Sequence, residues 1–166
     1  MQALLAGMDY DFSQFTMEGF ARWLEQRRGR RIVFVPWPMP PTLFGAWLTG
    51  GDDDYVFYEE NTLPIHQAHI QLHEMAHMLC GHPAARIDSL PAQTPLRQAE
   101  MSSVVSALFL RSSHTGEIEL EAETLASLIQ EQALRHDGLE KLTTAIRPNG
   151  DFTTYLASYL ETVDLP

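Results

Sequence analysis

The feature that most constrains how this chain can fold is the stretch from Pro64 to Gly81. Pro64 fits the first turn of a helix, where its missing backbone donor costs nothing, and Thr62 lies where it can cap that helix. Gly81 is typical of a residue that ends a helix. The apolar residues of the stretch share one side at helical spacing: Leu72, Met75 and Leu79. We therefore expect a helix that begins near Pro64, ends at Gly81 and packs against a core.

This stretch contains the motif His73-Glu74-Met75-Ala76-His77. Residues four apart on a helix differ by about 40° around the axis and by one turn along it, so the two imidazoles face a single point. That geometry suits zinc, which would lower the pKa of a water molecule and polarise a carbonyl group. Glu74, about 100° further round, can accept the proton of that water as a general base. The motif predicts a hydrolytic zinc site, and its alternative is a polar patch of two histidines.

A catalytic zinc ion needs a third protein ligand, and candidates lie in the glutamate-rich segment from Gly116 to Ala126. The segment reads as part of a helix with one apolar stripe, formed by Ile118, Ala122, Leu125, Ala126 and Ile129. Glu119 and Glu121 flank that stripe almost symmetrically, so periodicity alone leaves both open as the ligand.

Two details favour Glu119. The small residues Ala122 and Ala126 stand beside it and would let this helix approach the histidine helix closely. Glu123, one turn further on, shares its face and could hydrogen-bond a ligating histidine. Glu121 stays the alternative ligand, although acidic residues also suit the first turns of a helix through the helix dipole.

Composition limits the class of protein. A chain of 166 residues that is 45% hydrophobic suits one domain, residues 1–166, with a real core. No stretch approaches the roughly 20 apolar residues that cross a bilayer, and the amino terminus lacks the pattern of a signal peptide, so we expect a cytoplasmic protein without a membrane partner. The net charge of -11 would repel a phosphate backbone, and we expect no direct binding of nucleic acid.

Further elements are expected around the motif. Strands are predicted at 31–36, 45–49 and 55–60, the last two as a hairpin, and helices at 13–28, 96–111, 115–135 and 152–163. The arginines between residues 27 and 31 are interpreted as a solvated helix end. The stretch 83–114 separates the two motifs, and its helix 96–111 could cover a cleft.

Together the two motifs resemble those of the ImmA/IrrE-type metallopeptidases, gluzincins of bacteria and their mobile elements. Glu119-Leu120-Glu121-Ala122-Glu123-Thr124-Leu125-Ala126 looks like the family's Glu-x-x-Ala-Asp/Asn-x-Phe-Ala helix, with Glu123 in place of the usual Asp or Asn. The resemblance implies a zincin-like α+β fold, in which a small twisted sheet of about three strands, mixed or antiparallel, packs on the active-site helix. It also implies one zinc ion per chain, held by His73, His77 and Glu119, with Glu74 as the catalytic base.

The resemblance further implies a zinc-dependent endopeptidase that cleaves a protein regulator, typically a cognate helix-turn-helix repressor. The acidic surface would favour a basic segment of that substrate. The alternative is a zinc-binding regulatory or antitoxin-like module that has lost turnover and acts by binding its partner.

The remaining candidates are less specific. His66 and His69 continue the face of the motif and are interpreted as polar residues bordering the cleft rather than as an auxiliary metal site. His82 is interpreted as a helix-end group that compensates the dipole.

A donor for the oxyanion could come from His114, or from Tyr155 and Tyr159 if the terminal helix folds back, although amphipathic packing is the favoured explanation of the tyrosines. The strand at 55–60 is the one on which we expect an extended peptide to pair, because it directly precedes the catalytic helix.

Overall fold

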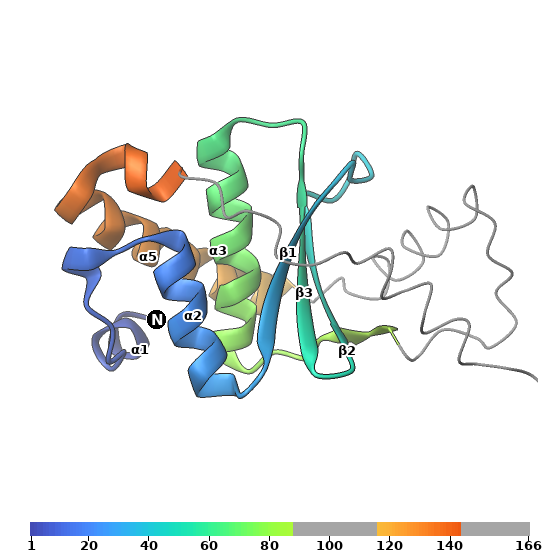
Figure 1. Ribbon diagram of the computed structural model, residues 1–166, viewed down its shortest axis with the longest axis horizontal. Coiled ribbons are helices and arrows are strands. Elements are labelled where there is room, and N and C mark those ends of the chain that lie inside the picture. The colour runs from blue at the N-terminus through green and yellow to red at the C-terminus, as the bar shows by residue number, and fades with distance from the viewer. Residues whose placement is uncertain (88–115, 144–166) are drawn as a thin grey trace, which may run out of the picture.

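The computed structural model describes residues 1–87 and 116–143, with side chains in the second range as far as residue 135. This part of the chain has an α+β fold, in which a mixed four-stranded sheet lies beside packed helices (Figure 1). The expected fold class is therefore confirmed. The predicted helices at 96–111 and 152–163 lie outside the described residues, as do His114, Tyr155 and Tyr159.

The sheet contains β1 (Arg31–Trp37), β2 (Gly45–Gly50), β3 (Asp53–Glu59) and β4 (Ala85–Arg86), in the spatial order β1-β3-β2-β4. β2 and β3 form the expected antiparallel hairpin, while β1 pairs with β3, and β4 with β2, in parallel. About three strands were expected from the sequence. β4 is the additional strand, and its two paired residues are too few to show an alternating pattern.

The position of β3 corrects the prediction about peptide pairing. Val56 faces Phe34 of β1 on one side and Trp47 of β2 on the other, so both edges of β3 are already paired. An added peptide has no place beside a strand in the middle of a sheet. The sequence shows the reason, because an almost continuously apolar run is typical of a strand buried on both faces.

The helices that the structure describes are α1 (Gln2–Ala6), α2 (Met17–Arg28), α3 (Pro64–Cys80) and α5 (Gly116–Thr143), with a short 3-10 helix, η1, at Phe12–Gln14. α2 begins at Met17 rather than at residue 13, because Thr16 caps it by accepting a hydrogen bond from the backbone of Gly19 at 2.9 Å. α5 continues past residue 135, the end expected from its pattern. No helix in these ranges is long and apolar enough to span a bilayer.

α3 has the bounds that its sequence predicts, with Pro64 in the first turn and Gly81 after its last residue. The expected cap is wrong, because Leu63 takes the capping position without a side-chain hydrogen bond. Thr62 lies one residue too early, and its hydroxyl contacts Nδ1 of His66 at 2.9 Å instead.

α3 lies at the centre of the described fold, between the sheet and α5 (Figure 1). Leu72 and Met75 of α3 are completely buried, and so are Ala122 and Ala126 of α5. Because alanine side chains are small, α5 can approach α3 closely along this line. The metal-motif helix is thus held rigidly from two sides.

The arginines between residues 27 and 31 are only in part the solvated helix end expected from the sequence, because Arg27 and Arg31 are exposed whereas Arg28 and Arg30 are partly buried. Asp54 of β3 is completely buried, and its two carboxylate oxygens accept hydrogen bonds from Arg28 and Arg30 at 3.0 Å each. A buried carboxylate is stable only when it is paired in this way. The two arginines therefore connect the end of α2 to the sheet.

Candidate metal centre

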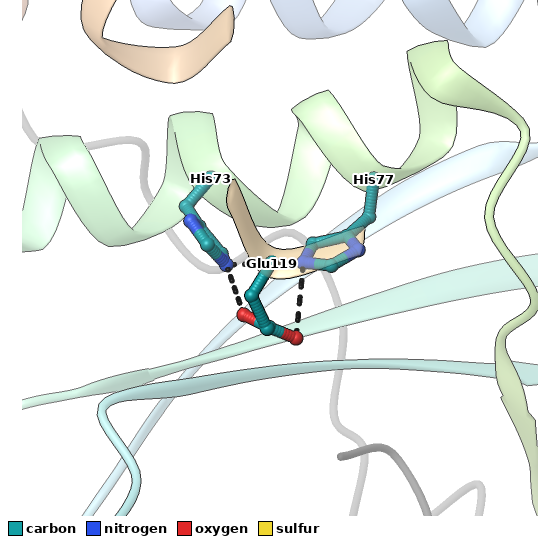
Figure 2. A group of neighbouring side chains, drawn as sticks. All are labelled: His73, His77 and Glu119. Atoms are coloured by element: carbon teal, nitrogen blue, oxygen red, sulfur yellow. Dashed lines mark hydrogen bonds and ion pairs between the residues drawn. The ribbon is translucent and has the colours of Figure 1, made fainter. Parts of the chain in front are cut away.

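Three side chains predicted as metal ligands meet at one point, as Figure 2 shows. Nε2 of His73 lies 3.0 Å from Nε2 of His77 and 3.2 Å from Oε2 of Glu119. Nε2 of His77 lies 3.7 Å from the other carboxylate oxygen of Glu119. The two histidines come from consecutive turns of α3, and the glutamate comes from the first turn of α5.

These distances fit a metal ion. With zinc bonds of about 2.0 to 2.1 Å, the ligand atoms of a tetrahedral site lie roughly 3.3 Å apart. The three observed separations, 3.0, 3.2 and 3.7 Å, bracket that value. Two imidazole nitrogens and a carboxylate oxygen also form a donor set that zinc commonly uses, with a fourth position open. The group can therefore hold a metal ion, and its chemistry suits zinc.

The packing of α5 on α3 determines which glutamate reaches the histidines. Ala122 and Ala126 are buried against α3, and Glu119 lies one turn before Ala122 on the side that faces His73 and His77. Glu121, the alternative ligand, points elsewhere and contacts Nε2 of His82 at 3.1 Å.

Glu123 lies where the sequence predicts a residue that hydrogen-bonds a metal-ligating histidine. Its Oε2 lies 3.3 Å from Nδ1 of His73, and both of its oxygens lie 3.1 Å from Nε2 of His69. Partial burial would raise the pKa of Glu123, but hydrogen bonds and charge from these two histidines hold it below the ordinary value. An imidazole whose second nitrogen meets a carboxylate is held in orientation for metal binding.

Glu74 is buried beside the three predicted ligands, with 7% of its surface exposed. Burial, followed by the negative charge of Glu119, raises the pKa of Glu74 to about 8, although a hydrogen bond from the backbone of Trp47 opposes the shift. A carboxyl group with this pKa can gain or lose a proton near neutral pH, and it lies beside the group that can hold a metal ion.

Gly45 is important for the site, although it was not among the residues predicted from the sequence. A Cβ atom at Gly45 would lie 2.6 Å from Oε1 of Glu74 and 2.5 Å from Cγ2 of Ile70. β2 can thus lie against Glu74 only because residue 45 has no side chain. The one signal in the sequence is a glycine at the start of a strand, which often marks a close approach of another group.

The group opens into a cleft with a volume of about 540 Å³. Its walls come from α3, from the start of α5, and from the chain that leads into β2, residues 42–46. His66 and His69 border it, as expected, with His66 against the ring of Phe44 at 5.1 Å. Neither histidine belongs to the group of potential ligands found in the described residues. The volume is in the range of ligand-binding pockets in proteins.

His82 has a second contact that the sequence analysis missed. Its Nδ1 lies 2.9 Å from Nδ1 of His77, on the opposite side of that ring from the predicted metal. A helix-end position explains why a histidine is favourable there, but not this contact. The one signal in the sequence is Gly81, because a glycine that ends a helix turns the next residue back over the last turn of that helix.

No protein family model, curated protein or solved structure matches this chain. The resemblance to the ImmA/IrrE-type metallopeptidases therefore rests on the two sequence motifs. The structure adds that these motifs, which are 46 positions apart, meet in one group of two histidines and a glutamate.

Proposed function

We propose that this protein is a zinc-dependent endopeptidase of the ImmA/IrrE type, which hydrolyses a peptide bond in a protein regulator. The observation that carries the proposal is the position of Glu74. Its buried carboxyl group lies in the same open cleft as His73, His77 and Glu119, so a base and a metal-binding group face one space.

The side chains divide the chemistry between them. Zinc bound by His73, His77 and Glu119 would lower the pKa of water and polarise the carbonyl group of a substrate. Glu74 takes the proton of the attacking water and passes it to the leaving amine. The backbone N–H of Trp47 and the close approach of Gly45 hold its carboxylate in position for both transfers.

The first half of β2 supports binding of an extended peptide. In the part of the chain that the structure describes, β4 pairs with β2 only at Leu48 and Thr49, whereas residues 42–46 line the cleft. A peptide that adds to β2 at Gly45 and Ala46 would bring its backbone past the metal-binding group. This placement replaces the predicted pairing with β3.

The chemistry of the cleft supports a substrate with a basic segment. Glu123 lines it with a carboxylate that is not a predicted zinc ligand, and the whole chain carries a net charge of -11. Opposite charge favours encounter with a basic partner. A helix-turn-helix regulator, whose DNA-binding surface is basic, fits this requirement, and a cytoplasmic location is consistent with such a partner.

The proposal is tested by comparing the wild-type protein with Glu74→Gln. Both are prepared with zinc, analysed for metal, and incubated with a peptide library from digested bacterial protein, in which mass spectrometry detects new termini. We expect about one zinc ion per chain in both proteins, and cleavage only by the wild type, because the amide cannot accept a proton. Glu117→Gln, which changes an exposed carboxylate on α5, is the control and should cleave normally.

Two results would contradict the proposal. A wild-type protein with less than about 0.1 zinc ion per chain after preparation with excess zinc has no metal site of this kind. Equal effects of wild type and Glu74→Gln on a partner regulator in cells, with zinc bound to both, would show that binding rather than hydrolysis inactivates the partner. The protein would then be the zinc-binding regulatory module.

A further inference from the structure

The end of α3 determines where His82 lies. Gly81 has a left-handed backbone, with φ 72° and ψ 26°. Its N–H bonds the carbonyl group of Met78 at 3.2 Å, and the N–H of His82 bonds the carbonyl group of His77 at 3.0 Å. This pair of bonds is the Schellman motif, which turns the chain back over the last turn of its helix. The turn brings the two rings together, with centroids 5.0 Å apart.

The contacts of the two rings form a chain of hydrogen bonds with one consistent direction. A histidine that offers Nε2 to a metal carries its proton on Nδ1. Nδ1–H of His77 then donates to Nδ1 of His82 at 2.9 Å. The proton of His82 is consequently on Nε2, which donates to Oε2 of Glu121 at 3.1 Å. Both N–H donors in this series of hydrogen bonds therefore have an acceptor.

We propose that His82 and Glu121 are positioning residues, which hold the ring of His77 in the tautomer and orientation that bind the metal. The inference rests on the metal site of the proposed function. His77 would then be oriented by a hydrogen bond at Nδ1, as His73 is by Glu123. Nδ1 of His73 lies 3.3 Å from Oε2 of Glu123. Both histidines predicted as metal ligands are then held in orientation by a hydrogen bond at Nδ1.

Burial indicates which of the two residues contributes more. The side chains of His77 and His82 are 2% and 8% exposed, so the contact between them is shielded from water. A buried N–H that loses its acceptor carries the full cost of desolvation. The side chain of Glu121 is 54% exposed, and water can replace part of its contact. We expect a larger effect from His82 than from Glu121.

The test measures zinc affinity by competition with a chromophoric chelator, together with the visible spectrum of the Co²⁺-substituted protein. His82→Leu fills the space of the ring but offers no acceptor. His82→Asn keeps an acceptor, because its Oδ1 lies near the place of Nδ1. His66→Leu is the matched control on α3, since His66 contacts Thr62 instead of a predicted ligand.

We expect His82→Leu to weaken zinc binding by about 10- to 100-fold and to change the Co²⁺ spectrum. His82→Asn should restore most of the affinity, and His66→Leu should bind as the wild type does. Glu121→Gln should weaken binding by only a few-fold, at the lower end of that range, and Glu117→Gln not at all. If His82→Leu does not fold, two other comparisons of zinc affinity test the inference. One compares His82→Asn with the wild type, and the other compares Glu121→Gln with Glu117→Gln.

Two outcomes would overturn the inference without affecting the proposed function. One is a His82→Leu protein with wild-type affinity and spectrum. The other is a His82→Asn protein as weak as His82→Leu, which would show that packing of the ring matters and not its acceptor. A wild-type protein that binds no zinc would instead remove the proposed function, and this inference with it.

Discussion

Replacing Gly45 with alanine tests how tightly β2 must lie against the proposed base. The added Cβ would meet Cγ2 of Ile70 at 2.5 Å, Oε1 of Glu74 at 2.6 Å and the carbonyl oxygen of Phe57 at 3.2 Å. Since carbon atoms pack at about 3.5 to 4.0 Å, the first two contacts require shifts of roughly 1 Å. Phe57 belongs to the central strand β3 and cannot yield, so the side chains of Glu74 and Ile70 must move.

Two magnitudes follow from these contacts. Overpacking of this kind costs about 1 to 3 kcal/mol in the free energy of unfolding. Moving a catalytic group by about 1 Å reduces the rate by roughly 100-fold. Zinc affinity should change little, because the three atoms nearest to the new methyl group belong to none of His73, His77 and Glu119.

The assays for Gly45→Ala are urea unfolding, chelator competition for zinc, and the rate of cleavage of a peptide that the wild type hydrolyses. Gly116→Ala is the matched control, because a Cβ at Gly116 would meet nothing within 4 Å. It should keep the wild-type rate and stability. If Gly45→Ala cleaves at the wild-type rate, β2 does not hold Glu74 in position and the reasoning from this contact is wrong.

Three more predictions concern pH, the buried ion pair and the metal. The pKa of Glu74 in the zinc-free fold, about 8, is above its ordinary value of 4.5. The stability of zinc-free wild type relative to Glu74→Gln is therefore greatest below pH 4.5 and falls as the pH rises toward 8, by up to about 1.4 kcal/mol per pH unit. Urea unfolding near pH 5 and pH 7 measures this fall. The prediction is wrong if the difference in unfolding free energy between the two proteins is the same at both pH values. Asp54→Ala leaves two partly buried guanidinium groups without their carboxylate and should lose about 3 to 5 kcal/mol of unfolding free energy. The control is Glu18→Ala, which removes the exposed Glu18–Arg22 pair and should cost under about 1 kcal/mol. Free zinc at 100 times its dissociation constant should stabilise the wild type by about 2.7 kcal/mol in a thermal or urea assay, and His73→Ala should abolish that gain.

Local patterns in the sequence were sufficient for the helix that carries the motif. Pro64 and Gly81 marked its ends, and helical spacing placed His73 and His77 one turn apart on one face. The hairpin of β2 and β3 was also predictable, because a glycine- and aspartate-rich turn separates two apolar runs. These features depend on neighbours within a few residues, and the sequence contains all of that information.

Contacts between distant parts of the chain could not be predicted in the same way. Glu119 and Glu121 flank their stripe equally; the small residues beside Glu119 favoured it in the sequence, and the packing of α5 on α3 brings it to the histidines. Asp54 is followed by an ordinary strand pattern, yet its buried carboxylate is paired with Arg28 at the end of α2 and with Arg30 in the turn before β1.

The sequence by itself therefore determined the motif helix, its histidine spacing and the hairpin, because backbone periodicity and turn chemistry act locally. The tertiary structure decided which of the two candidate glutamates joins the histidines, and that β3 lies in the middle of the sheet. The physical reason is that each of these depends on which faces of separate elements meet when the core is buried. Periodicity identifies such faces but does not pair them.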